Sequence, residues 1–366
     1  MDVYFLPIKV AFITFPFLAL LFTFPFAIYQ YKKYGYINKF RVFILYSFLL
    51  YLIAAYYLVI LPLPRVRDLK SLQVPGTRHF SLIPFTFIKD LMKETRVVID
   101  VPSTYKNLLT ERAFLQAIFN AVLLTPLGIY LRYYFKKDLK KTILITFCVS
   151  LFFEITQITG IFGIYNAPYR LFDVDDLFLN TLGGYIGYLI SPMFTFFLPS
   201  REELDVELSA EKIRITYFRR FLSYLVDMFL ISLIPNVKES ILLEALIFFI
   251  YFIVIVYFTN GLTIGKWLMN IKVKGQKDRL KFKEAFIRYG ILYLGIFSGN
   301  KFLTAISNLN QHTDFNYGLV IIVMLQLLIS FLIGVHFLLC VLKKNRFFYE
   351  KISDTSIVIL KNKKNV

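Results

Sequence analysis

The sequence has few of the residues from which compact reactive or metal-binding sites are built. Its 366 residues include two cysteines, three histidines and one tryptophan. Cys148 and Cys340 lie far apart in apolar stretches, so we predict neither a disulfide framework nor a cysteine-rich metal site. The histidines show no ligand spacing and no glycine-rich phosphate loop is present. We therefore predict no metal and no cofactor.

Acidic residues are also scarce compared with basic ones. The chain has 24 Asp and Glu against 42 Lys and Arg, a net charge of +18. The basic residues are dispersed over several short connections instead of forming one soluble basic face, which argues against a nucleic-acid partner. Their distribution is typical of retention on the cytoplasmic side of a membrane and of attraction to anionic lipids. Membrane lipids are thus the first predicted partner.

Apolar residues are abundant. Hydrophobic residues make up 57% of the chain and aromatic residues 18%, and the mean hydropathy is +0.62. A bilayer core about 30 Å thick requires about 20 apolar residues per helix, and each span must satisfy its own backbone hydrogen bonds. We predict an all-α, polytopic transmembrane protein of about nine spans. They lie at 8–30, 41–62, 113–135, 142–163, 177–198, 221–234, 241–260, 286–306 and 317–342.

The short connections predict the orientation. Lys and Arg collect after the first, third, fifth, seventh and ninth spans, which places these connections inside. The connection at 164–176 is acidic, and that at 307–316 has no Lys or Arg. The N-terminus is then outside and the C-terminus inside. The long connection at 63–112 carries both signs of charge, and alternation of the spans places it outside.

A change in composition near residue 200 divides the chain. Pro199 and Ser200 close the fifth span, and the following stretch is hydrophilic and acidic. We predict a membrane domain at 1–199 that includes an extra N-terminal span, a hydrophilic linker at 200–216, and a second membrane domain at 217–366 with a basic cytoplasmic tail.

Polar motifs interrupt the first domain at four places. They are Ser81-Leu82-Ile83-Pro84-Phe85, Asn120 followed by Leu124-Thr125-Pro126-Leu127-Gly128, Glu154-Ile155-Thr156-Gln157, and the run from Arg170 through Asp173, Asp175, Asp176 and Asn180 to Gly183-Gly184-Tyr185. In these residues the chain resembles the VanZ-like family, whose pattern includes N-L-I-P-F, N-x-x-L-F-x-P-L-G, E-x-x-Q and R-x-x-D-V-D-D-x-x-x-N-T-x-G-G. The resemblance covers about 40–195, and Ser81 departs from it because the family has Asn at that position.

The polar motifs also predict a cluster. Glu154 and Gln157 are three residues apart, and Asp176 and Asn180 are four apart, so each pair shares a helix face. A carboxylate at membrane depth is costly and faces protein or water, and we predict Arg170, together with Asp173, beside Glu154. The candidate site consists of Asn120, Glu154, Gln157, Arg170, Asp173, Asp175, Asp176 and Asn180. An interhelical hydrogen-bond network, a site for the headgroup of an outer-leaflet amphiphile, and catalysis all remain open.

Two features of the first domain predict helix packing. Gly183, Gly184 and Gly187 allow close helix approach. Pro126 predicts a kink in the third span, with Asn120 or a neighbour bonding the freed carbonyl.

The second domain has its own motif order. It begins with Arg219-Arg220 and Asp227, continues with Thr263-Ile264-Gly265-Lys266-Trp267 and Arg288, and ends with Tyr349-Glu350-Lys351 and Thr355-Ser356-Ile357-Val358. This order resembles the RDD family over about 214–362. Arg220 and Asp227 match its first two positions, and seven residues place them on one helix face, which predicts an ion pair. Glu350 stands where the family has Asp, and Tyr349 where it has His.

Two classes of function follow. The VanZ resemblance implies a non-enzymatic protein of the bacterial cytoplasmic membrane that binds or shields an envelope amphiphile, such as a lipid-linked cell-wall component or a lipoglycopeptide, and affects susceptibility to teicoplanin-type glycopeptides. The alternative is an ion or small-solute transporter that uses Asp227, Arg220 and Glu154. An enzyme acting on lipid-linked precursors is a weaker third hypothesis, so enzyme status stays open with a non-enzymatic role favoured. The sequence does not predict the oligomeric state.

Overall fold

The computed structural model describes residues 2–74, 76–205, 215–235, 241–297 and 317–360. It divides into two compact units. Unit 1 comprises Met1–Thr23 and Asn38–Val206, and unit 2 comprises Phe24–Ile37 and Glu207–Val366. The first helix, α1 (Asp2–Lys33), therefore contributes its two ends to different units. The linker predicted at 200–216 falls mostly on 206–214, which lie outside the described residues.

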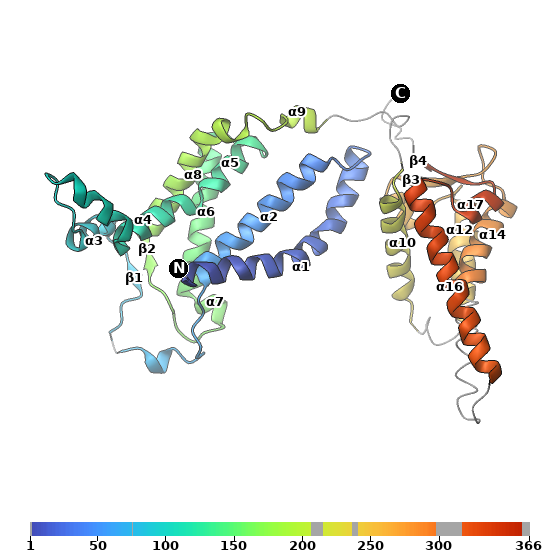
Figure 1. Ribbon diagram of the computed structural model, residues 1–366, viewed down its shortest axis with the longest axis horizontal. Helices are drawn as coiled ribbons and strands as arrows, with labels where there is room; N and C mark the ends of the chain where they lie inside the picture. Colours follow the sequence, from blue (N-terminus) through green and yellow to red (C-terminus); the bar gives the residue numbers. More distant parts are fainter. Residues whose placement is uncertain (1, 75, 206–214, 236–240, 298–316, 361–366) are drawn as a thin grey trace. The chain divides into compact units, whose positions relative to one another are not determined.

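Unit 1 is helical (Figure 1). Besides the first part of α1 it contains α2 (Lys39–Ile60), η1 (Lys70–Leu72), β1 (Phe80–Ser81), α3 (Thr86–Glu94), η2 (Pro102–Thr110), α4 (Arg112–Leu123), α5 (Thr125–Tyr133), α6 (Leu139–Ile158), α7 (Gly160–Gly163), β2 (Phe172–Asp173), α8 (Val174–Thr195) and α9 (Arg201–Leu204). Side-chain caps define where the long helices begin, since the first backbone N–H groups of a helix lack internal acceptors. Asn38 caps α2, Asp138 caps α6 and Asp173 caps α8.

Glycines bring α8 against its neighbours. A Cβ added at Gly183 would lie 2.0 Å from the Ala121 carbonyl oxygen, and one at Gly187 would lie 2.0 Å from that of Thr125. A Cβ at Gly184 would lie 2.4 Å from the Thr146 side chain. Backbone therefore touches backbone at two of these contacts, and the prediction of close packing is confirmed.

The third predicted span is broken where Pro126 was expected to bend it. α4 ends at Leu123 and α5 begins at Thr125, with Leu124 outside helical geometry at φ −99° and ψ 6°. The Val122 carbonyl, which loses the donor that Pro126 lacks, accepts from the Leu124 N–H, and not from Asn120. The Tyr51 hydroxyl donates to the neighbouring Leu123 oxygen at 2.9 Å.

Unit 2 combines helices with one small antiparallel sheet (Figure 1). Its elements are α10 (Tyr217–Ser232), α11 (Ile241–Phe248), the π-helix η3 (Phe249–Val254), α12 (Ile255–Phe258), α13 (Ile264–Leu268), β3 (Ile271–Lys274), α14 (Phe282–Tyr289), the π-helix η4 (Gly290–Phe297), α16 (Tyr317–Lys343), α17 (Phe348–Ile352) and β4 (Ser356–Ile359). β3 pairs with β4 so that Ile271 lies opposite Ile359. The end of α1 belongs here because Ala27 and Tyr31 are buried against Leu222 and Met269.

Five helices of the described part are long and apolar enough to cross a membrane. They are Phe5–Lys33, Lys39–Ile60, Arg112–Tyr133, Leu139–Ile158 and Val323–Lys343. They coincide with the predicted spans at 8–30, 41–62, 113–135, 142–163 and 317–342, so an all-α membrane protein is confirmed in outline. The other four predicted spans fall on shorter or less apolar helices or, in part, on 298–316. The number nine and the orientation stay predictions.

Cysteine labelling tests the orientation. In a chain whose two native cysteines are changed to Ser, we expect Lys106→Cys to react with an impermeant thiol reagent in intact cells and Lys277→Cys to react only after lysis. Both positions are exposed, so accessibility to water does not distinguish them. Labelling of Lys277→Cys in intact cells would invert the topology.

Candidate functional site

Asp175 fixes a surface helix of unit 1. α3 starts at Thr86, and its N-cap residue Phe85 has a left-handed φ of 63° and a side chain that provides no cap. Asp175 of α8 supplies the missing acceptors: Oδ1 accepts from the Phe85 N–H at 2.5 Å, and Oδ2 accepts from the Thr86 hydroxyl at 2.6 Å and the Phe87 N–H at 2.9 Å. An acceptor at the N-terminus of a helix satisfies its free N–H groups and its positive dipole end. Asp175 thus ties α3 to α8 across 90 residues of sequence.

Glu154 holds the loop that leads into α8. Its carboxylate is buried in α6, and Oε2 accepts from the Asp173 N–H at 2.9 Å. Phe172 and Asp173 also pair in parallel with Phe80 and Ser81, which joins this loop to the connection after α2. The Asp173 side chain accepts from the Asp175 N–H at 2.9 Å and so caps α8. Burial raises the pKa of Asp173, and the neighbouring Asp175 carboxylate adds to this effect.

The other polar residues of the cluster join helices. The Asn120 amide donates to the carboxylate of Asp176, which connects α4 to α8. Asn180 donates to the Ser150 hydroxyl at 2.9 Å, and its own side-chain oxygen is buried without a hydrogen bond among the described residues. Gln157 donates to the Val59 carbonyl at 3.0 Å. These contacts tie α2, α4, α6 and α8 together.

A small polar cavity of about 50 Å³ lies between α3, α4 and α8. Four carboxylates and two side-chain amides contribute to its wall. Its lining residues are Thr86, Phe87, Asp90, Arg112, Ala113, Gln116, Ala117, Asn120, Asp173, Asp175, Asp176 and Leu179. The structure thus gathers Asn120, Asp173, Asp175 and Asp176 of the predicted cluster at one cavity. Glu154, Gln157 and Asn180 support it from outside its lining, and sequence reasoning missed Asp90 and Gln116.

Arg170 does not pair with Glu154 as predicted. Its Nη2 donates to the Leu61 carbonyl at 3.3 Å, and the described residues include no ion pair between Arg170 and a carboxylate within 4.0 Å. Glu154 instead takes its donor from the backbone of Asp173. A backbone N–H thus satisfies one oxygen of this buried carboxylate in place of the ion pair that the sequence argument assumed.

Asp227 lies at a second buried polar site, in unit 2. Its Oδ1 accepts from the Tyr251 hydroxyl at 2.8 Å and from the Gly265 N–H at 2.7 Å. Oδ2 accepts from the Thr263 hydroxyl at 2.7 Å and lies 3.8 Å from the Lys266 Nζ. The carboxylate therefore connects α10 to α13 and has donors on both oxygens, as a buried charge requires.

Arg220 pairs with Glu350, so the predicted pair of Arg220 and Asp227 is wrong. Its Nη1 lies 3.2 Å from Glu350 Oε2, and Nη2 of Arg288 donates to Glu350 Oε1 at 2.9 Å. Seven residues on a helix share a face but lie about 10.5 Å apart along its axis, and direct pairs on a helix form at three or four residues. Burial acts to raise the pKa of Glu350, but the charges of Arg288 and Arg220 outweigh it and hold this pKa below its usual value.

Arg219 is the residue of this region that sequence reasoning missed. It is 1% exposed, and it donates to the carbonyl oxygens of Met269 at 2.6 Å, Gly35 at 2.9 Å and Asn270 at 3.0 Å. Its guanidinium lies 4.4 Å from the centre of the Tyr31 ring. A signal was available, since Arg219 lies eight residues before Asp227 and therefore on the buried stripe of α10.

Comparisons with known proteins agree with the two motif sets. Residues 48–198 match the family model described as VanZ/LLP1, and residues 239–354 match the RDD family model. The predicted fusion of a VanZ-like region with an RDD region is confirmed. The RDD match begins after Arg220 and Asp227, so their assignment to the first two RDD positions stays a prediction. No curated protein and no protein of solved structure matches the chain.

Proposed function

We propose that this membrane protein, with its VanZ-like and RDD regions, is a non-enzymatic protein of the bacterial cytoplasmic membrane. It binds an envelope amphiphile at the outer surface of the membrane and thereby affects susceptibility to teicoplanin-type glycopeptides. One observation carries the proposal: the acidic cavity between α3, α4 and α8 is lined in part by α3, a short helix whose other face exposes apolar side chains. This pairing of an acidic pocket with an apolar surface suits a ligand that has a polar or cationic head and an apolar body.

The cavity and the helix supply different parts of that recognition. About 50 Å³ accommodates a single polar group such as an amine, and not a whole glycopeptide. Phe85, at the start of α3, and Ile88 and Met92 within it are 48%, 43% and 74% exposed, on the face of the helix opposite the cavity-lining residues. Exposed apolar side chains on a short amphipathic helix are typical of contact with a membrane surface or an amphiphile.

The hydrogen bonds favour binding over catalysis. A general acid or base must exchange a proton with its substrate, whereas the carboxylates of Asp175 and Glu154 accept from backbone groups that they hold in place. Asp90 is different: it lines the cavity from α3, is exposed, and accepts no hydrogen bond from a described residue.

The transporter hypothesis has less support from the contacts. It relied on Asp227, Arg220 and Glu154, and each of these is engaged by protein partners. A transport site near the bilayer midplane commonly uses unwound helices that expose backbone groups to the solute. The donors around Asp227 instead join α10 to α13.

The test is a matched pair of charge changes in a strain that lacks the gene. Asp90→Asn keeps the shape of a cavity-lining side chain and removes its charge. Asp100→Asn makes the same change at an exposed position of the same connection, outside the cavity. We expect both variants to reach wild-type abundance in the membrane, with Asp100→Asn restoring the glycopeptide phenotype and Asp90→Asn restoring less than a tenth of it.

Two outcomes would contradict the proposal. Equal complementation by both variants would mean that the cavity charge has no part in the phenotype. An Asp90→Asn variant that abolishes an ion-dependent flux in vesicles, with no change in susceptibility, would favour the transporter.

A further inference from the structure

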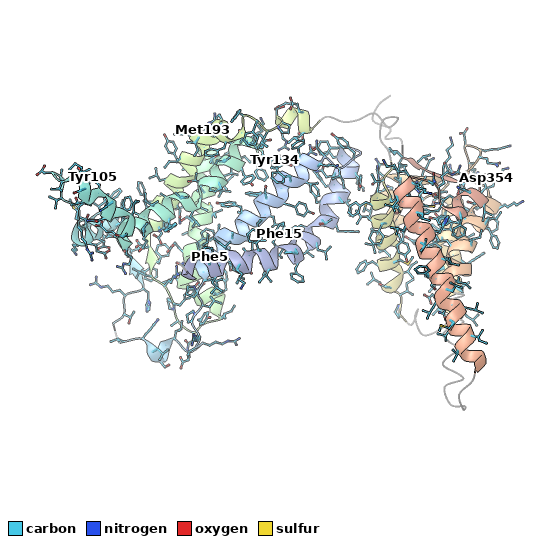
Figure 2. The ribbon with its side chains drawn as sticks, viewed as in Figure 1. Phe5, Phe15, Tyr105, Tyr134, Met193 and Asp354 are labelled. Carbon is cyan, nitrogen blue, oxygen red and sulfur yellow. The ribbon has the colours of Figure 1, made fainter. Side chains whose placement is uncertain are left out.

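A second cavity of unit 1 has the opposite charge. It has a volume of about 360 Å³ and lies where α5 and α8 end. Figure 2 shows this end of the two helices, with Tyr134 and Met193 labelled. The cavity is lined by Arg132, Tyr133, Lys136, Lys137, Tyr188, Ser191, Pro192 and Thr195. Three cations and no carboxylate contribute to this lining.

Pro192 places one of the cations. Proline has no backbone N–H, so the carbonyl four residues earlier, that of Tyr188, loses its helical donor. Arg132 supplies the replacement: its Nη1 donates to the Tyr188 oxygen at 2.7 Å, and its guanidinium lies 4.6 Å from the centre of the Tyr188 ring. Arg132 is thereby held at the cavity wall, with Nε and Nη2 not engaged by any described residue. A guanidinium positioned in this way suits an oxyanion.

Nearby acids neutralise this charge only weakly. Glu202 Oε1 lies 3.8 Å from the Lys136 Nζ, and both side chains are exposed, so the pair contributes little. Asp138 accepts from the N–H of Lys141 at 2.8 Å and lies 3.2 Å from its Nζ. No ion pair of Lys137 is found in the described part of the chain. The cavity therefore retains a net positive charge.

Apolar side chains are exposed at the same end of α8 as the basic cavity. Met193 is 72% exposed, and Phe196 and Phe197, which follow α8, are 82% and 69% exposed. Cations beside exposed apolar side chains at the end of a membrane helix match the two parts of an anionic lipid, its phosphate and its acyl chains. Because 177–198 is a predicted span, these side chains are expected to lie against lipid acyl chains, which favours a lipid headgroup as the source of the anion.

We propose that this cavity binds the phosphate of an anionic phospholipid in the cytoplasmic leaflet. The predicted orientation places the connection after α5 on that side, where anionic headgroups attract basic residues. Arg132 is the fixed donor, Lys136 and Lys137 contact the phosphate, and the acyl chains extend into the bilayer past the exposed side chain of Phe196. The site is separate from the acidic cavity and does not depend on its function.

The test measures binding of acyl-labelled phosphatidylglycerol to the full chain purified in an uncharged detergent. Lys136→Ala with Lys137→Ala removes two lining cations. Lys140→Ala with Lys141→Ala removes the same charge from exposed positions outside the lining. We expect the first double variant to bind the lipid more than tenfold more weakly, since two charge-assisted hydrogen bonds are lost, and the second to bind within about twofold of wild type.

Competition identifies the ligand. Unlabelled phosphatidylglycerol should displace the probe, phosphatidylcholine should not, and glycerol 1-phosphate should displace it only at far higher concentration. Equal losses in the two double variants would overturn the proposal in favour of diffuse charge attraction. Displacement by phosphatidylcholine would mean that the site recognises only the apolar part of a lipid. Displacement by glycerol 1-phosphate as effective as that by phosphatidylglycerol would mean that the site binds a soluble phosphate. Either result would overturn the proposal of an anionic lipid site.

Discussion

Gly187→Ala is expected to prevent stable assembly of unit 1. The new Cβ would lie 2.0 Å from the Thr125 carbonyl oxygen, which is backbone and cannot rotate away, so α5 and α8 would have to separate. Alanine favours a helix over glycine by about 1 kcal/mol, but overpacking typically costs about 1–3 kcal/mol, and a 2.0 Å contact with backbone belongs at the upper end of that range or above it. The clash therefore outweighs the gain in propensity. Membrane abundance and the thermal stability of the purified chain are the measurements.

Gly334→Ala is the matched control for this change. Gly334 also lies inside a long apolar helix, α16, and an added Cβ there would meet nothing within 4 Å. We expect it to be neutral or slightly stabilising, because only the propensity gain remains. Similar stabilities of the two variants would mean that α5 and α8 are not in close contact.

Local sequence signals predicted much of unit 1. Apolar runs of about 20 residues predicted its long helices, and Gly183 and Gly187 predicted the close approach of α8 to its neighbours. Pro126 predicted a kink where the structure has the break between α4 and α5. Each of these features depends on residues within one helix or on one small side chain. Such features can be predicted from a single sequence because the length of an apolar run and the spacing of small residues along a helix determine them.

The partners of the buried charges were not predictable in the same way. Asp175 finds its donors 88 to 90 residues earlier in the chain, at the start of α3, and Arg220 finds Glu350 130 residues later. Helix periodicity gives the face on which a side chain lies and not the element packed against that face. Backbone donors and acceptors add to the difficulty, because Glu154 and Arg170 are each satisfied by a main-chain group that no residue type identifies.

Glu350→Gln is expected to destabilise unit 2 by about 3–5 kcal/mol, the range for removing one partner of a buried ion pair. The Glu350 side chain is 1% exposed and Arg288 is 3% exposed, so the change would leave a buried guanidinium without its counter-charge. Asp354→Asn is the control, since Asp354 is an exposed carboxylate four residues away, and it should have little effect. Glu350→Asp keeps the charge with a shorter reach and should recover part of the stability.

The pH dependence separates a charge effect from a packing effect of the same substitution. Because the pKa of Glu350 is lower in the folded chain than its usual value of 4.5, its contribution is fully present above that value and is lost as the pH falls through the folded pKa. Thermal unfolding of the wild type in detergent should therefore shift to lower temperature on acidification below about pH 4.5, and the Glu350→Gln variant should lack this component. Two results for Glu350→Gln would contradict this prediction: a stability equal to that of Asp354→Asn, or the acid dependence of the wild type. Either result would mean that the contacts of Arg220 and Arg288 with Glu350 do not stabilise unit 2 through charge.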